Sequence, residues 1–73
     1  MAEAQVQQLV KMAHQIALNL QAEGDLATLR AAEHIRKFWT RAMRERLVQH
    51  SLTAEADLPE PVQAVAAVLG GAG

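Results

Sequence analysis

The sequence of 73 residues has no cysteine and no tyrosine, and its aromatic side chains are one Phe and one Trp. Without cysteine, neither a disulfide nor a thiolate metal site can reinforce the fold. A domain of this size buries only about 60% of the surface that its unfolded chain exposes, so its own core is marginal. Small chains without such reinforcement often gain stability from a partner. We therefore expect a subunit that is bound to another protein.

Long apolar runs are also absent. No stretch of about 18 uninterrupted apolar residues occurs, so the sequence predicts no membrane-spanning helix. The N-terminus lacks the basic region and apolar region of a secretory signal peptide. We therefore expect a cytoplasmic protein, and the lack of cysteine is compatible with a reducing compartment.

Positive charge is concentrated in the middle of the chain. Residues 30–46 hold six of the seven Lys and Arg residues against two acidic residues, which gives this segment a charge of +4. The remainder holds one Lys against six acidic residues and has a charge of −5, so the net charge is −1. A basic centre between acidic flanks predicts a polarised surface.

Apolar residues recur with helical spacing along the first half of the chain. The first stripe consists of Val6, Leu9, Val10, Ala13, Ile16, Ala17 and Leu20. We expect Gly24 to end this helix as its C′ residue and Asp25 to cap the next one. A second stripe follows from Leu26 onward, ending in Phe38 or Trp39. Because the link is short, the two helices should fold back as an antiparallel hairpin.

The region from Asp25 to about His50 can be one helix or two. Helical spacing of apolar residues continues through this region, and the region contains neither Gly nor Pro. Thr40 is the candidate N-cap at which the helix would break. Sequence alone leaves both alternatives open.

The last helix is expected after Pro59 and Pro61, because proline fits a helix only in its first turn. Glu60 suits the positive end of the helix dipole there, and Gly70 with Gly71 should end the helix. No segment shows a strand pattern. The sequence therefore predicts an all-α fold: one three- to four-helix domain over residues 1–69, made of a helical hairpin and short C-terminal helices. A flexible Gly-rich tail is expected over residues 70–73.

The residue types needed for chemistry are not grouped. The histidines His14, His34 and His50 are too far apart in sequence for two of them to share a helix turn as metal ligands. No hydroxyl residue stands in a recognisable arrangement with a base and an orienting acid, and no Gly-rich phosphate loop opens a helix. We therefore expect no catalytic residue, no cofactor-binding residue and no metal ligand.

The segment HIRKFWTRAMRER, residues 34–46, contains both aromatic residues and most of the basic ones. Its simplest interpretation is an amphipathic helix with a solvated basic face. Nucleic-acid binding is the alternative, but it favours a domain pI above about 9, and this chain has a pI of about 6.3. Trp and Arg are enriched at the energetic centres of protein interfaces, which favours protein binding.

Two blocks, the second of which overlaps this segment, carry a family resemblance. Residues 9–16, LVKMAHQI, are similar to L-V-x-M-A-N-Q-I, and residues 32–39, AEHIRKFW, are similar to A-x-H-I/L-x-K-F-W. A terminal P-x-V-x-x-A-V-x-x-L pattern fits the segment that ends at Leu69. These patterns resemble the delta subunit of cytoplasmic, NAD-dependent, molybdenum-containing formate dehydrogenase. The family usually has an acidic residue and then Pro after Phe-Trp, where this chain has Thr40 and Arg41.

The resemblance implies a non-catalytic accessory subunit of a soluble complex that oxidises formate to CO2 and passes the electrons to NAD. In such complexes the alpha subunit carries bis-molybdopterin guanine dinucleotide with Mo or W, and other subunits carry iron–sulfur clusters and FMN. The implied partners are the catalytic alpha subunit and, through it, the beta and gamma subunits. The implied role is assembly, stability or cofactor maturation. The alternative is a small helical nucleic-acid-binding or regulatory adaptor.

We expect the surface that binds the alpha subunit to lie in the HIRKFWTRAMRER segment. The expected binding residues are His34, Arg36, Lys37, Phe38, Trp39, Met43 and Arg44. In this hypothesis the apolar residues among them form an anchor and the basic residues pair with acidic groups around it. Whether Trp39 lies in the core or in the interface stays open.

Overall fold

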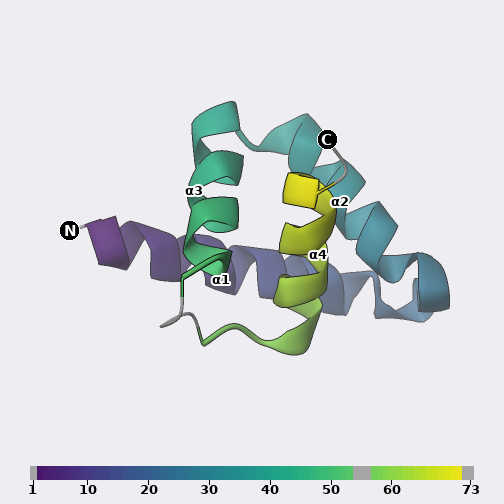
Figure 1. Cartoon of the computed structure of the whole chain (residues 1–73). Helices are drawn as coiled ribbons and strands as arrows, with labels where there is room; N and C mark the ends of the chain where they lie inside the picture. The colour runs from purple at the N-terminus through teal and green to yellow at the C-terminus, as the bar shows by residue number, and fades with distance from the viewer. Residues whose placement is uncertain (1, 54–56, 72–73) are drawn as a thin grey trace.

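The computed structural model describes residues 2–53 and 57–71, with side chains from residue 5 onward. The described residues form four α-helices and one 3-10 helix and contain no strand, which confirms the all-α class. Figure 1 shows α1 (Ala2–Asn19), η1 (Gln21–Leu26), α2 (Ala27–Phe38), α3 (Arg41–Ser51) and α4 (Glu60–Gly71). No helix in these two ranges has the length and apolar character needed to cross a lipid bilayer.

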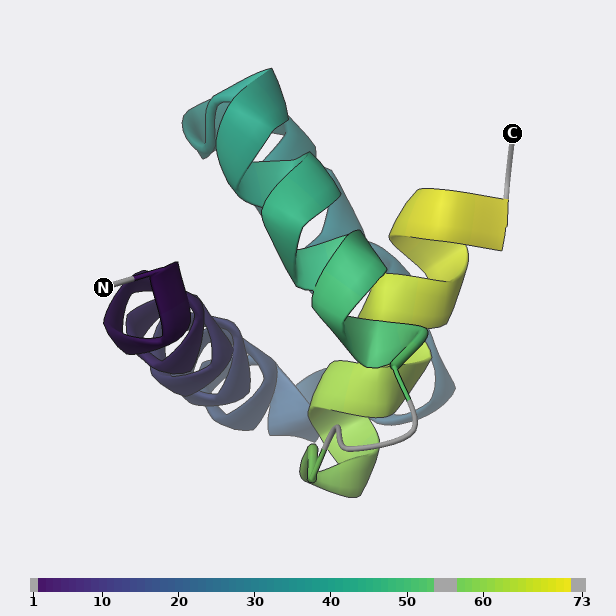
Figure 2. The ribbon, with the colours of Figure 1, turned by 60° about the vertical axis from the view of Figure 1, so that its left-hand side comes forward.

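Helix α4 is the centre of the arrangement, because it packs on α1, α2 and α3 (Figures 1 and 2). The chain turns back at η1, as the short link predicted, and α2 then diverges from α1 (Figure 1). Helix α3 packs across the N-terminal half of α1, beside α4 (Figures 1 and 2). As a result the C-terminal end of α4 lies near the end of α2 and the start of α3.

The core lies where the apolar stripes of the outer helices meet α4. Its largest fully buried side chains are Ile35, Leu47, Val62 and Val65. Burying a side chain of this kind contributes about 1.5–3 kcal/mol. Three fully buried alanines, Ala13, Ala31 and Ala32, lie among them and let the helix backbones approach closely. The core is therefore small and relies on close packing of short side chains.

The first connection differs from the sequence prediction. Helix α1 ends at Asn19, where the Leu20 N–H donates to the carbonyls of Ile16 and Ala17, both at 3.2 Å, and the chain tightens into η1. Gly24 lies inside η1 with φ 64° and ψ −127°, so the prediction that it is the C′ residue of the first helix is wrong. Its positive φ serves the chain reversal instead.

The start of α2 also differs from the prediction. Leu26, not Asp25, occupies the N-cap position of α2, and no side chain there makes a capping hydrogen bond. The prediction that Asp25 caps this helix is wrong. The reversal at Gly24 is the physical reason, because the backbone N–H of Ala27 donates to the Gly24 carbonyl and the turn itself leads into the helix.

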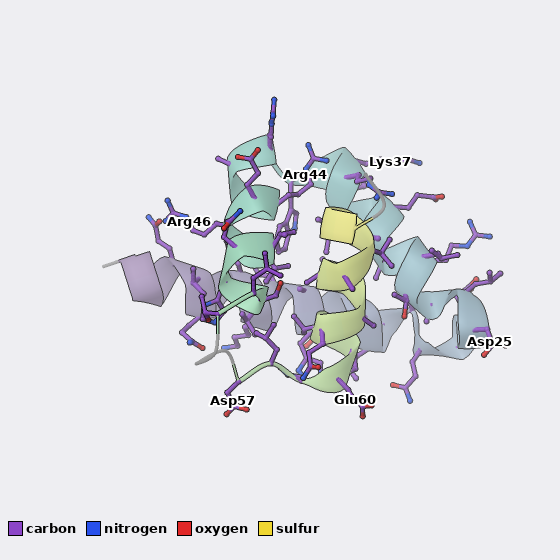
Figure 3. The ribbon with its side chains drawn as sticks, viewed as in Figure 1. Asp25, Lys37, Arg44, Arg46, Asp57 and Glu60 are labelled. Atoms are coloured by element: carbon purple, nitrogen blue, oxygen red, sulfur yellow. The ribbon has the colours of Figure 1, made fainter. Side chains whose placement is uncertain are left out.

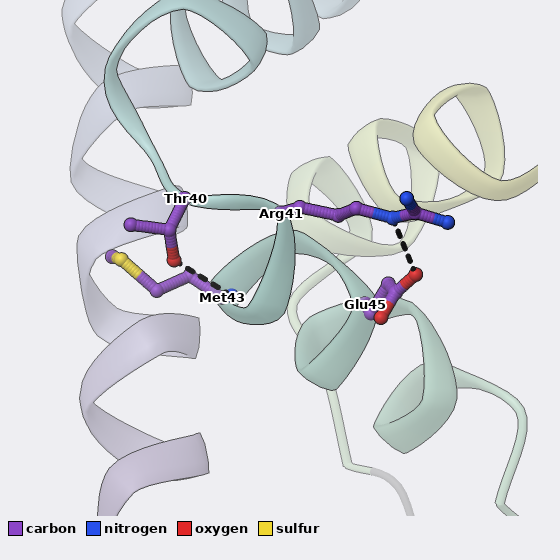
Figure 4. Close-up of polar contacts among 4 residues, drawn as sticks. All are labelled: Thr40, Arg41, Met43 and Glu45. Atoms are coloured by element: carbon purple, nitrogen blue, oxygen red, sulfur yellow. Dashed lines mark hydrogen bonds and ion pairs between the residues drawn. The ribbon is translucent and has the colours of Figure 1, made fainter.

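The region from Asp25 to His50 contains two helices, not one. Helix α2 ends at Phe38, and the next two residues, Trp39 and Thr40, have extended backbones with ψ of 149° and 160°. The Met43 N–H donates to Thr40 Oγ1 over 3.2 Å (Figure 4). Thr40 is therefore the N-cap of α3, which decides between the two alternatives in favour of a break.

Helix α4 begins as predicted, with Glu60 in its first turn and Pro61 as its second residue. Its last two residues are Gly70 and Gly71, so the helix ends at these glycines, as predicted. Gly70 lies against α3, where a Cβ would come 2.7 Å from Val48 Cγ1, and this close approach suits a residue without a side chain. Residues 72–73 of the predicted tail, and residues 54–56 between α3 and α4, lie outside the described residues.

Candidate functional site

Basic side chains gather where α2 ends, α3 begins and α4 ends. Figure 3 shows Lys37 and Arg44 at this end of the molecule and Asp57 and Glu60 at the opposite end. The separation agrees with the polarised surface that the charge distribution predicted. We call this region the basic end. Its four members are Arg36, Lys37, Arg41 and Arg44.

Arg36 contacts the neighbouring helix. Its Nη2 donates to the Val68 carbonyl over 3.4 Å, in the last turns of α4. That helix has no basic residue in its own last turn. The carbonyls at a helix C-terminus carry partial negative charge and lack partners within the helix, so a cation there is stabilising. Arg36 therefore stabilises the contact between α2 and α4, and it also contributes positive charge to the basic end.

Arg41 and Arg44 are both on α3 but differ in surroundings. Arg41 is exposed, and its Nε donates to Glu45 Oε1 over 3.0 Å (Figure 4). Exposed ion pairs of this type contribute little to stability. Arg44 is half-buried between α3 and α4 (Figure 3). Its Nε is enclosed without a hydrogen-bond partner among the described residues. Such a donor reduces stability unless a group from outside the chain satisfies it.

The most exposed aromatic side chain lies next to the basic end. Phe38 is 71% exposed, and its ring is stacked on that of His34, with 4.6 Å between the centroids and a tilt of 36°. The two residues are one helical turn apart on α2, and Lys37 beside them is also exposed. We call His34, Lys37 and Phe38 the Phe38 patch. Exposed aromatic side chains are of the type that is enriched at protein interfaces.

One of the expected binding residues, Trp39, lies in the core, and another, Met43, packs against it. Trp39 is 7% exposed and belongs to the buried cluster, which settles that it is a core residue of this chain. Met43 is half-buried and packs against the same cluster. The structure thus divides the predicted site: the Phe38 patch is on the surface, Arg36 contacts α4, Arg44 and Met43 are half-buried, and Trp39 lies in the core.

A groove between α1 and α3 is a feature that sequence reasoning missed. It has a volume of about 410 Å³ and is lined by Gln5, Gln8, Leu9, Met12, Ala42, Met43 and Arg46. We call it the α1–α3 groove. The lining residues of α1 follow helical spacing beside the core stripe, but nothing in the sequence shows that α3 lies next to them. Across the groove Arg46 Nη1 donates to Gln5 Oε1.

No group of three His, Asp or Glu side chains within residues 5–53 and 57–71 is placed to hold a metal ion. The three histidines lie on different helices, His14 on α1, His34 on α2 and His50 on α3. What this part of the chain offers is a polarised surface, an exposed aromatic patch and an apolar groove, all of which are features of protein binding.

Comparison with known families gives a match. The model of the family described as NADH-dependent formate dehydrogenase delta subunit FdsD matches residues 8–67. The chain belongs to this family. The matched range includes all seven expected binding residues and every lining residue of the α1–α3 groove except Gln5. The match confirms the resemblance read from the sequence. No curated protein and no solved structure matches the chain.

Membership of the FdsD family places the chain among the subunits of an NAD-dependent formate dehydrogenase. The other subunits of such a complex are the partners that this membership implies. The block at residues 32–39, which carried part of the resemblance, provides three core residues, Ala32, Ile35 and Trp39, and one exposed aromatic residue, Phe38. This family block therefore contributes side chains both to the core and to the exposed surface.

Proposed function

We propose that this chain is a non-catalytic docking subunit of a cytoplasmic NAD-dependent formate dehydrogenase, and that it binds the catalytic alpha subunit through the Phe38 patch. The observation that carries the proposal is the exposure of Phe38 at 71% inside a family-matched segment. Because the core of such a small chain is marginal, burying both aromatic side chains would stabilise the fold. One of the two aromatic residues is nevertheless on the surface.

The geometry of the patch suits a binding anchor. The Phe38 ring lies against that of His34. A side chain that is held in place before binding loses less entropy when a partner covers it. Aromatic and charged side chains of this kind dominate the energetics of protein interfaces. Lys37 and the basic end would attract an acidic surface and accelerate the encounter.

The role in the complex that we propose is support of assembly, stability or cofactor maturation. The cofactors implied for such a complex are bis-molybdopterin guanine dinucleotide with Mo or W, iron–sulfur clusters, FMN and NAD. Within the described residues no group of three His, Asp or Glu side chains is placed to hold a metal ion. We propose that the cofactors are held by the other subunits, including the beta and gamma subunits that are reached through the alpha subunit.

The test is affinity purification of the tagged full chain with the other subunits of its own complex. Phe38→Ala should reduce recovery of the alpha subunit, with binding weaker by about 30-fold, the effect of losing a hot spot of about 2 kcal/mol. Leu52→Ala is the matched control, because Leu52 is another large apolar side chain, 75% exposed, at the far end of α3. Circular dichroism checks that both variants fold. Equal recovery for Phe38→Ala and the wild type would reject the patch as the anchor.

The alternative class, a nucleic-acid-binding or regulatory adaptor, has a simple discriminating measurement. Binding to DNA or RNA should weaken steeply with salt if several phosphates are contacted. The overall charge of −1 and the acidic groups at the far end of the molecule oppose this class. Absence of binding at low salt eliminates it.

A further inference from the structure

The α1–α3 groove has an apolar floor and a polar rim. Leu9 is buried at 7% exposure, and Met12 and Met43 are half-buried and pack against the core beneath the groove. The rim consists of exposed residues from both helices: Gln5, Gln8, Ala42 and Arg46. Figure 4 shows the Met43 side chain pointing from α3 towards α1. An apolar floor between two helices is a surface on which a third helix can pack.

The shape of the groove favours a peptide segment over a small molecule. Sites for small ligands are concave enough to bury most of the ligand surface. Here the rim residues are all exposed, so the groove is open to solvent on one side, and the hydrogen bond between Arg46 and Gln5 crosses it. Helix-in-groove binding uses an open apolar channel of this kind. Methionine side chains are flexible and polarisable, and they adapt well to an incoming apolar surface.

The charge of the groove restricts what its occupant can carry. Arg46 is the one ionisable side chain in the lining, and it is exposed (Figure 3). Within the described side chains it donates to Gln5 and has no carboxylate within 4.0 Å. A guanidinium has five N–H donors, so Arg46 retains donors for a carboxylate from outside. Carboxylates are therefore the complementary groups at this rim.

We infer that the α1–α3 groove receives an amphipathic helix of another formate dehydrogenase subunit, with apolar side chains on Met12 and Met43 and an Asp or Glu paired with Arg46. The inference rests on the proposed function and adds a second contact to it. The groove and the Phe38 patch involve different residues, so the two contacts can be tested separately.

Two substitutions test the groove without disturbing the core. Ala42→Glu places a longer, negative side chain on the rim of the groove, and it keeps helix propensity in the first turn of α3, where a carboxylate is favourable. Arg46→Glu reverses the charge that faces the partner. The matched controls are Ala67→Glu, at an exposed position of α4, and Lys11→Glu, which reverses an exposed charge on α1 outside the groove.

The experiment measures binding of the full chain to the other subunits of its purified complex. We expect Ala42→Glu and Arg46→Glu each to weaken binding by about 30-fold, as hot-spot losses do. Both controls should stay within about twofold, as surface changes outside an interface do. A photo-crosslinker at position 42 should join a helical segment of another subunit that has one apolar face and an acidic residue beside it.

The outcomes separate this inference from the proposed function. Wild-type binding by both groove variants overturns the inference, and the proposed function then stands if Phe38→Ala still weakens binding. A crosslink from position 42 to a second copy of the chain, or to a segment without an acidic residue, also overturns the inference. Failure of the unmodified chain to bind any subunit rejects the proposed function itself.

Discussion

Phe38 and Trp39 are consecutive residues with opposite surroundings: the Phe38 side chain is 71% exposed and the Trp39 side chain is 7% exposed. Phe38 is the last residue of α2, and Trp39 has an extended backbone with φ −94° and ψ 149°. The Trp39 N–H still donates to the Ile35 carbonyl over 2.8 Å, so the core residue is tied to the end of the helix. The pair lies at the boundary between the core and the Phe38 patch.

This difference predicts opposite results for the two alanine variants. Trp39→Ala should lower the free energy of unfolding by about 3–5 kcal/mol, because it leaves a large cavity in a small core. Phe38→Ala should change it by less than about 0.5 kcal/mol, as exposed positions do. Urea unfolding followed by circular dichroism measures both. Trp39→Phe is a milder core variant if Trp39→Ala does not fold, and equal effects at positions 38 and 39 would contradict the assignment of Trp39 to the core.

The break between α2 and α3 depends on the Thr40 side chain. Thr40→Ala removes the acceptor of the Met43 N–H and should lower the free energy of unfolding by about 1 kcal/mol, the usual effect of losing an N-cap. Thr40→Ser keeps the hydroxyl and serves as the control, with stability close to that of the wild type. Thermal unfolding of the two variants side by side measures the difference, and equal stabilities would show that the cap contributes nothing.

The reversal at η1 depends on the backbone of Gly24. A Cβ at this position would meet no atom within 4 Å, so only the conformation, φ 64° and ψ −127°, opposes a side chain. Gly24→Ala should therefore destabilise the protein by about 1–3 kcal/mol through backbone strain. Gly71→Ala is the control, because its surroundings are open and its φ is not positive. A stable Gly24→Ala variant would mean that η1 adopts another turn.

The contact between α3 and α4 depends on space at Gly70. An Ala Cβ there would lie 2.7 Å from Val48 Cγ1, and valine is stiff because it branches at Cβ. Gly70→Ala should destabilise by about 1–3 kcal/mol, as overpacking does. Adding Val48→Ala should relieve part of that loss, because neighbouring substitutions couple. Additive effects in the double variant would show that the helices do not meet at this point.

Much of the fold is predictable from the sequence. The apolar spacing indicated the helices, the Pro-Glu-Pro segment indicated the start of α4, and the residues at 9–16 and 32–39 indicated the family that was then confirmed. Thr40 was visible as a candidate cap, but propensity alone could not decide whether the helix breaks there. A cap contributes only about 1 kcal/mol, and tertiary packing outweighs contributions of this size.

The candidate site was less predictable. Seven residues were expected to bind a partner, yet their positions in the chain did not show that Trp39 is buried or that Arg36 reaches the Val68 carbonyl. The turn at Gly24 was placed wrongly because a glycine marks a reversal without specifying which residues of the turn remain helical. No pattern within a single helix indicates the α1–α3 groove, because its lining comes from two helices.

By itself, the sequence determined the helix class, the family and the separation of charge, because these properties depend on residue types and on spacing within one segment. The tertiary structure alone decided which of two adjacent aromatic residues is buried, which arginine stabilises α4 and where a groove opens. The physical reason is that periodicity reports the faces of one helix. Burial and grooves depend on the helix that covers each face, and here that helix comes from a distant part of the chain.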